Sequence, residues 1–365
     1  MVIGNKEIYE LCLIPTERCN LNCRYCMVDK IKGGKTKLSV AFTAIDEMMF
    51  LKKNFDGYTI SFMGGEPFLN FNFIRQVVSY VKKTYPNKTI FYEIVTNGTL
   101  LTAEIKAWIK DNINKLKIVL SLDGDKKTQD IHRSNSFDLI DLEFFKRLPS
   151  PTVNMVITPT SLQDLVHNLS FLDSNGFSVR AFLEEGTRWK DEHMAVFAQT
   201  LKSLVDFYII HPDVKICSLL RNSFYLLEDD EIILGCSSHK YSYAISAEGI
   251  KYECHRCLPY ENTGEIKIPN ASLKKLSDFR LLKDECRECY ISKLCNSCPA
   301  TNAARNGNSE LIERRCMMNK IIYKAQAYLF SQLLVTHPNH AVFECLSKKH
   351  KIGTIVAIQK ILQIL

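Results

Sequence analysis

Three cysteines near the N-terminus have a spacing that suits an iron–sulfur cluster. Cys19, Cys23 and Cys26 stand in the run ERCNLNCRYCM, with three and then two residues between them. Three thiolates on one short loop can hold three irons of a [4Fe–4S] cube, which leaves the fourth iron open to a reactant. A fully ligated cube could only pass electrons. Part of a zinc site is the other interpretation of this spacing.

A second group of cysteines stands further along the chain. Nine of the 14 cysteines fall between residues 217 and 316. The paired thiols of CRECYISKLCNSC would also suit the tetrahedral coordination of zinc. Regular hydrophobic periodicity fades over the same stretch, so we expect it to owe its order to bound metal rather than to a large apolar core. These cysteines are Cys217, Cys236, Cys254, Cys257, Cys286, Cys289, Cys295, Cys298 and Cys316.

Glycine-containing polar motifs mark the ends of three predicted strands. They are GGEP from Gly64, TNG from Thr96 and SLDG from Ser121, and Arg133 follows the last of them. Two adjacent glycines let a ligand approach the backbone closely, although a tight strand exit would also explain them. In a parallel barrel the carboxyl ends of the strands meet at one face, where functional sites are assembled. The motifs and the first cysteine loop are therefore expected to share one face.

Alternation of β-rich and amphipathic runs over residues 8–183 provides the elements that position these motifs. The pattern predicts a parallel sheet with right-handed crossovers, either a partial (β/α)6 barrel or an open doubly wound sheet. Helices are predicted after Ser39, Asn70 and Thr102 and from about Ser161, the last ending at Gly176. A helical stretch covers about 191–210, and further helices follow Cys316. The six β-rich runs begin at Ile8, Tyr58, Thr89, Leu116, Thr152 and Ser178.

Composition excludes several classes of protein. The 365 residues are 46% apolar and 24% charged, as in ordinary globular proteins. No apolar run is long enough for a membrane span and no export signal is visible, which predicts a cytoplasmic protein without a membrane partner. The formal charge of +7 counts cysteines as neutral, so cluster thiolates would offset it. We therefore expect no nucleic-acid partner.

The first cysteine loop together with GGEP resembles the radical S-adenosylmethionine (SAM) superfamily. The resemblance implies a SAM-binding [4Fe–4S] cluster on Cys19, Cys23 and Cys26, with GGEP near the methionyl amine of SAM. Ser121 and Arg133, twelve residues apart, match a serine and an arginine that contact the ribose and carboxylate of SAM in such proteins. The full set of SAM contacts that the resemblance implies is Tyr25, Gly64, Gly65, Glu66, Asn97, Ser121, Asp123, Arg133 and Leu183.

The second cysteine group resembles the SPASM domain, which carries two auxiliary [4Fe–4S] clusters. The resemblance implies three clusters in all and the boundaries 1–211 for the barrel, 212–320 for SPASM and 321–365 for C-terminal helices. One departure is that Cys295 and Cys298 enclose two residues where the family usually has three. The distal cluster would use Cys286, Cys289, Cys295 and Cys316. The nearer cluster would use Cys236, Cys254 and Cys298, with Cys257 as a possible fourth ligand, while Cys12, Cys217 and Cys345 are expected to be ordinary buried residues.

The resemblance implies an enzyme in which a 5′-deoxyadenosyl radical removes hydrogen from a ribosomally made precursor peptide. The outcome would be a C–S or C–C crosslink or epimerisation. Alternatives are a sulfatase-type formylglycine maturase, a small-molecule dehydrogenase and a non-catalytic electron carrier. His255 replaces the aspartate that such maturases carry after the cysteine matching Cys254, and it is a candidate base. We expect a flavodoxin- or ferredoxin-type electron donor and, because about eight residues precede the first strand, a separate peptide-recognition protein or direct docking.

Overall fold

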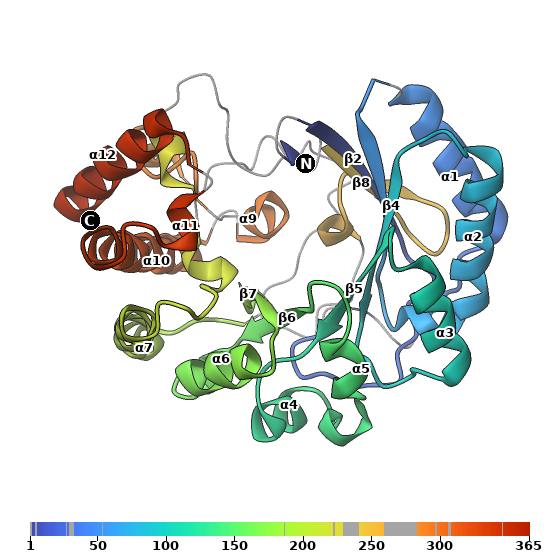
Figure 1. The fold of residues 1–365 in the computed structure, drawn as a ribbon, viewed down its shortest axis with the longest axis horizontal. Helices are drawn as coiled ribbons and strands as arrows, with labels where there is room; N and C mark the ends of the chain where they lie inside the picture. Colours follow the sequence, from blue (N-terminus) through green and yellow to red (C-terminus); the bar gives the residue numbers. More distant parts are fainter. Residues whose placement is uncertain are drawn as a thin grey trace. The chain divides into compact units, whose positions relative to one another are not determined.

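Two compact units make up the chain (Figure 1). The first comprises Met1–Leu122, Gln129–Val153 and Ser237–Leu276, and the second comprises Asp123–Thr128, Asn154–Cys236 and Ser277–Leu365. Cys236 and Cys345 lie outside the described residues. The structure, a computed structural model, describes residues 2–3, 6–26, 28, 33–52, 54–185, 187–221, 223–228, 241–258, 283–295, 298–305, 308–344 and 346–365.

A mainly parallel sheet forms the centre of the first unit. Its strands follow the order β5-β4-β3-β2-β8-β9, in which only β9 runs antiparallel to its neighbour, and β1 pairs antiparallel with β2. One register row aligns the buried side chains of Leu11, Ile60, Tyr92 and Leu116. The strands are β1 (Val2–Ile3), β2 (Lys6–Leu13), β3 (Gly57–Phe62), β4 (Ile90–Thr96), β5 (Leu116–Ser121), β8 (Ser242–Ile245) and β9 (Lys251–Tyr252).

Three helices cover the outer face of this sheet in Figure 1: α1 (Leu38–Leu51), α2 (Phe71–Thr84) and α3 (Ala103–Asn112). Helix α2 buries Phe73, Ile74, Val77, Val78 and Val81, the spacing of a single helical face. Helix α3 begins at the predicted cap, where the Thr102 hydroxyl accepts a hydrogen bond from Ile105 N at 3.3 Å. The predicted start of α1 after Ser39 is wrong, because the helix already begins at Leu38.

The described part of the first unit also contains shorter elements. A 3-10 turn, η1 (Pro67–Asn70), begins at the proline of GGEP, and α4 (Lys126–His132) begins in the second unit and ends in the first. The 3-10 turn η2 (Phe137–Leu139) and helix α5 (Leu142–Lys146) follow α4. A further 3-10 turn, η6 (His255–Cys257), stands after β9.

The second unit is mainly helical. Strand β6 (Thr152–Ile157) begins in the first unit and ends here, and β7 (Ser178–Leu183) is hydrogen-bonded beside it. The 28-residue helix α10 packs against α7 and α12. The other elements are η3 (Pro159–Ser161), α6 (Leu165–Ser174), α7 (Asp191–Ile210), η4 (Ser218–Leu220), η5 (Phe224–Glu228), η9 (Asp284–Arg287), α9 (Pro299–Arg305), α10 (Ser309–Thr336), α11 (Ala341–Glu344) and α12 (Lys348–Ile364).

The predicted fold class is confirmed, with corrections of detail. All six predicted strands form, as β2 to β7, and helices stand between them in an open sheet rather than a closed barrel across the described residues. Helix α10 already begins at Ser309, so Cys316 lies inside the helix rather than before it. Ser161 belongs to η3, and α6 begins only at Leu165. Strands β8 and β9 were not predicted. None of the described helices has the length and apolarity required to cross a bilayer.

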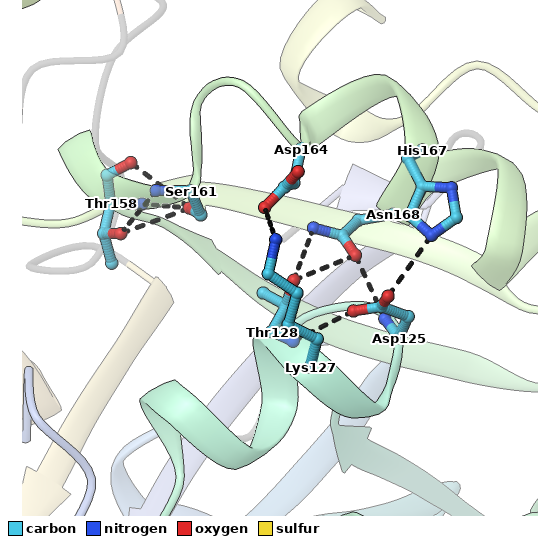
Figure 2. Close-up of polar contacts among 8 residues, drawn as sticks. All are labelled: Asp125, Lys127, Thr128, Thr158, Ser161, Asp164, His167 and Asn168. Carbon is cyan, nitrogen blue, oxygen red and sulfur yellow. Dashed lines mark hydrogen bonds and ion pairs between the residues drawn. The ribbon is translucent and has the colours of Figure 1, made fainter.

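A buried hydrogen-bond network in the second unit fixes the loop between β5 and α4 (Figure 2). Asn168 of α6 is fully buried, and its Oδ1 accepts a hydrogen bond from Asp125 N at 3.0 Å, while its Nδ2 donates to Thr128 Oγ1 at 3.0 Å. Gly124 has φ +146°, and a Cβ there would lie 2.1 Å from Asn168 Oδ1. The loop therefore needs glycine for both its backbone conformation and its close packing.

We expect Gly124→Ala to destabilise the protein much more than Gly176→Ala. Both glycines have positive φ, but a Cβ at Gly176 (φ +79°) meets nothing within 4 Å. Gly176→Ala should cost about 1 kcal/mol for the left-handed backbone alone. Gly124→Ala adds a collision and should cost at least about 2 kcal/mol more. Chemical denaturation of both variants measures the difference, and equal losses would contradict the packing argument.

Candidate metal centre and cofactor site

Hydrogen bonds join the start of the first cysteine loop to Gly34, which follows the loop in the chain. Thr16 Oγ1 and Glu17 N both donate to Gly34 O at 3.0 Å, and Gly34 N donates to the Glu17 carboxylate at 3.2 Å. Cys19, Cys23 and Cys26 are all half-buried, and Cys26 N donates to Cys23 O at 3.2 Å in a tight turn. The three thiols thus stand on one short loop that directly follows β2.

The segment after α4 holds this loop from another side. Arg24 N donates to His132 O at 3.0 Å, and Asn22 N donates to Ser134 Oγ at 2.9 Å. The Arg133 guanidinium lies 5.2 Å from the centre of the Tyr25 ring, a cation–π distance. Ser134 and its neighbour adopt left-handed φ values of 57° and 53°, which are costly for residues other than glycine. Predicted cofactor residues Tyr25 and Arg133 are therefore in contact, beside the cysteines.

GGEP packs directly on the cysteine loop. Gly65 N donates to Thr16 O at 3.0 Å, and Glu66 N donates to Arg18 O at 2.9 Å. A Cβ at Gly65 would lie 2.1 Å from Arg18 O, and Gly64 has φ +123°. Only glycine fits at Gly65, because the backbone of the cysteine loop occupies the space. The sequence predicts that these glycines let a ligand come close to the backbone. The structure adds a second reason, because the backbone of the cysteine loop packs against them.

Glu66 links GGEP to the end of β4. Its carboxylate is buried and accepts hydrogen bonds from Phe68 N at 3.1 Å, Thr96 Oγ1 at 2.8 Å and Asn97 N at 2.8 Å. Burial raises the pKa of Glu66 to about 7, although the three donors favour the charged form. Asn97 Nδ2 in turn donates to Asn20 Oδ1 at 2.9 Å and lies 3.8 Å from Cys19 Sγ. Two of the predicted motifs and the cysteine loop therefore form one hydrogen-bonded network.

The SLDG motif is divided between the two units. Ser121 is half-buried in the first unit, and its carbonyl accepts a bond from Gln129 Nε2 at 3.4 Å. Asp123 belongs to the second unit, where its buried carboxylate accepts a hydrogen bond from Val156 N of β6 at 2.9 Å. Leu183, also in the second unit, is buried at the end of β7. Asn168, which holds this loop, was not predicted, because its partners lie about 40 residues earlier in the chain.

Two cysteines of the second group lie in the first unit. Cys254 and Cys257 are buried, with their sulfurs 3.6 Å apart across the short turn η6. The hydrogen bond from Cys257 lowers the pKa of Cys254 to about 7. Burial, reinforced by the charge of Arg256, lowers the pKa of His255 to about 4, so its ring is neutral at pH 7.

The other described cysteines of this group lie in the second unit. Cys286 lies in η9 and Cys289 shortly after it, with Cys289 N donating to Cys286 O at 3.3 Å, and Cys316 lies on α10. The pKa of Cys316 is raised by burial, although Lys320 and Lys283 oppose the rise. Within the described ranges, no three His, Cys, Asp or Glu side chains converge on a single-ion site. A cube does not require such convergence, because each of its irons takes one protein thiolate.

Part of the chain is similar in sequence to known proteins. Residues 13–171 match the model of the radical SAM superfamily. Among curated proteins, an uncharacterized protein of Methanocaldococcus jannaschii is 40% identical over 34% of this chain and 41% of its own length. A cysteine-type anaerobic sulfatase-maturating enzyme of Clostridium novyi is 31% identical over 35% of this chain and 36% of its own. The chain therefore spans less than half the length of these two relatives. A GTP 3′,8-cyclase of Syntrophomonas wolfei is 27% identical over 82% of this chain and 93% of its own.

Solved structures share the fold over more of the chain. The enzyme anSMEcpe, in a structure with bound AdoMet and Cp18Cys peptide, has a TM-score of 0.70 at 19% identity and covers 91% of this chain and 99% of its own. Streptococcus suis SuiB, bound to the precursor peptide SuiA, has a TM-score of 0.56 at 18% identity, with coverage of 80% and 71%. At these identities the likeness is one of fold. The chain thus contains a radical SAM domain, the domain of a class of enzymes, over residues 13–171.

We expect Glu66→Gln to change how the stability of the metal-free protein depends on pH. Because burial raises the pKa of Glu66 from 4.5 to about 7, the folded state binds more protons than the unfolded state between these values. Glu66 should therefore reduce stability as the pH rises from 4.5 to 7, by about 3 kcal/mol in all.

Glu66→Gln should remove this contribution to the slope, whatever constant cost the substitution adds. Urea denaturation of both proteins at several pH values measures the two slopes. If the free energy of unfolding changes with pH by the same slope in both proteins, burial does not raise the pKa of the Glu66 carboxyl.

Proposed function

We propose that the chain is a radical SAM enzyme that acts on a peptide. Cys19, Cys23 and Cys26 would hold a [4Fe–4S] cluster with one open iron. When bound there, SAM and the cluster supply a 5′-deoxyadenosyl radical able to remove hydrogen from an unactivated carbon. The protein's own contribution is to orient SAM and to shield the reaction. Its proposed SAM contacts are Tyr25, Gly64, Gly65, Glu66, Asn97, Ser121, Asp123, Arg133 and Leu183.

The observation that carries this proposal is the network around the cysteine loop. Glu66 and Asn97 tie the loop to the ends of β3 and β4, and the segment 132–134 ties it to the end of α4. Three half-buried thiols are thereby presented beside polar groups at the carboxyl ends of parallel strands. Thiols on one anchored loop are a donor set that suits a cube with an open iron.

A peptide is the substrate class that the structural neighbours favour. The anSMEcpe and SuiB structures described above both hold a bound peptide. Hydrogen removal from such a peptide could lead to a C–S or C–C crosslink or to epimerisation. His255 is proposed as the base because its ring is neutral at pH 7, although the same lowering of its pKa to about 4 weakens it as a proton acceptor. A flavodoxin- or ferredoxin-type donor would supply the electron, and a separate recognition protein could deliver the peptide.

A second candidate is cyclisation of a purine nucleotide. It is favoured by the length of the match to the GTP 3′,8-cyclase, which extends well beyond residues 13–171. Formylglycine formation, as in the matched maturase, is a third possibility, and His255 in place of aspartate speaks against it.

The test is to incubate the reduced, iron-loaded protein anaerobically with SAM and one candidate substrate at a time. The substrates are a short peptide encoded beside the gene, a cysteine-containing sulfatase peptide and GTP. Formation of 5′-deoxyadenosine supports the proposal when the first peptide changes in mass through a crosslink, or when it takes up one deuterium in D2O through epimerisation, which leaves the mass unchanged in H2O. A product from GTP alone would assign the chain to nucleotide cyclisation, and a loss of sulfur from the sulfatase peptide would assign it to formylglycine formation.

We expect the reconstituted protein to hold three [4Fe–4S] clusters, about 12 iron atoms per chain. Cys23→Ala should lower this to about eight and abolish reductive SAM cleavage, because the first cube loses a ligand. Cys217→Ala is the matched control, since Cys217 is buried beside the Tyr208 hydroxyl and should leave both properties unchanged. Iron near four per chain, with zinc in addition, would contradict the two auxiliary clusters. Full SAM cleavage by Cys23→Ala would contradict the site.

Cys257→Ala tests the nearer auxiliary cluster. Cys257 lies three residues after Cys254 and its sulfur is 3.6 Å from that of Cys254. As a ligand, it should perturb the auxiliary EPR signal when replaced, while SAM cleavage continues. An unchanged spectrum with normal product would remove Cys257 from the ligand set and leave one iron of that cluster open to substrate.

A further inference from the structure

An asparagine of α10 contacts one of the proposed cluster cysteines. Asn319 stands one turn after Cys316, so the two side chains lie on the same helix face. Its side chain is almost completely buried, with 1% exposure, and its Nδ2 donates to Cys295 Sγ at 3.1 Å. Asn319 therefore brings together two cysteines of the proposed distal cluster, Cys295 by contact and Cys316 by helix position.

The orientation of the Asn319 amide lowers the stability of the folded protein. Its Oδ1 is buried without a hydrogen-bond partner among the described residues. Such a group costs about 1–3 kcal/mol, so an apolar side chain would be the more stable choice here. The amide nitrogen, by contrast, donates its hydrogen bond to the Cys295 sulfur. A thiolate sulfur is stabilised by a hydrogen-bond donor and not by an acceptor. The N–H···S bond is weak to a neutral thiol and becomes stronger when Cys295 carries negative charge.

A neighbouring residue on α10 holds Cys295 in place. Tyr323, one turn after Asn319, is buried and donates its hydroxyl hydrogen bond to Leu294 O, directly before Cys295. On the Cys316 side, Lys283 and Lys320 place positive charge near the thiol, but Lys283 is paired with Glu313 at 2.6 Å and burial still raises the pKa of Cys316. The contact that favours negative charge on a ligand sulfur is therefore the fixed N–H donor at Cys295.

We propose that Asn319 is a positioning residue that raises the reduction potential of the distal auxiliary cluster. The inference rests on the proposed function, which assigns Cys286, Cys289, Cys295 and Cys316 to that cluster. Adding an electron makes the cysteine sulfurs more negative, so an N–H···S hydrogen bond stabilises the reduced cluster more than the oxidised one. The cluster is thereby suited to accept an electron from its surroundings.

The experiment uses the full chain with Cys19, Cys23 and Cys26 all changed to Ala, so that only auxiliary clusters remain, at about eight irons per chain. Asn319→Leu in this background removes the donor at similar volume. We expect the potential of one auxiliary cluster, followed by EPR-monitored titration, to become more negative. The ratio of reduced to oxidised cluster at a fixed potential should fall roughly tenfold, or about 59 mV for one electron. Asn319→Asp, which adds a negative charge, should lower the potential further.

Thr354→Val is the matched control. Thr354 is a buried residue of α12 in the same unit, and its hydroxyl also has no partner among the described residues. Its replacement also turns a buried polar group into an apolar one, and it should leave both potentials unchanged. A similar shift in Thr354→Val would mean that general repacking, not the N–H···S bond, moves the potential.

The outcomes separate this inference from the proposed function. A potential equal to or above the parent's in an iron-loaded Asn319 variant overturns the inference. Loss of the cluster from both variants also overturns it, because Asn319 would then serve assembly rather than tuning. A parent without auxiliary iron refutes the cluster assignment itself. Cleavage of SAM is measured separately in Asn319→Leu with Cys19, Cys23 and Cys26 intact, and it should persist.

Discussion

The close approach of two backbones, at Gly65 and Arg18, is the constraint on which the cofactor side of the structure depends. With Arg18 O only 2.1 Å from where a Cβ would be, no other residue type fits at Gly65 without moving the cysteine loop. The approach also places Glu66 N in hydrogen-bonding distance of Arg18 O, and the Glu66 side chain then reaches Asn97. Burying the Glu66 carboxyl costs free energy, and its hydrogen bonds from Thr96 and Asn97 join GGEP to the end of β4 in addition to the pairing of β3 with β4.

A second segment that contacts the cysteine loop has a strained backbone. Ser134 and Asn135 are consecutive left-handed residues without glycine, which costs of order 1–3 kcal/mol each. The strained turn aims Ser134 Oγ at Asn22 N and keeps Arg133 over Tyr25. Strain of this kind persists only where the surrounding contacts determine it. The loop is thus fixed from two directions by backbone-directed hydrogen bonds, which suits a cluster whose open iron must face its cosubstrate in one geometry.

Local patterns predicted most of the sheet and the cysteine loop, whereas contacts between distant segments were missed. Six strands followed from hydrophobic runs that end in glycine or proline, and Thr102 correctly marked a helix start. Ser161 was misjudged as a helix start because Thr158 caps a separate 3-10 turn there. Strand β8 was missed, since its pairing with β2 joins residues more than 200 positions apart. Asn168 and Asn319 look like ordinary helix residues in the sequence, and only tertiary contacts give them a role.

The two cysteine regions differ in what holds them before metal binds. The first loop is fixed by bonds to Gly34, His132 and Ser134 that need no metal. In the second group, Cys254 and Cys257 meet in direct sulfur contact on a three-residue turn, and Cys286 lies in a four-residue turn. Such short elements contribute little packing of their own, so cluster binding there would also be folding. Helix α10 is the exception, because its 28 residues carry Cys316 and Asn319 on a scaffold packed against α7 and α12. Asn319 is mounted on that helix, and the hydrogen bond from Tyr323 of the same helix to Leu294 O holds the turn before Cys295 beside it, which gives the fixed geometry that tuning of a potential requires.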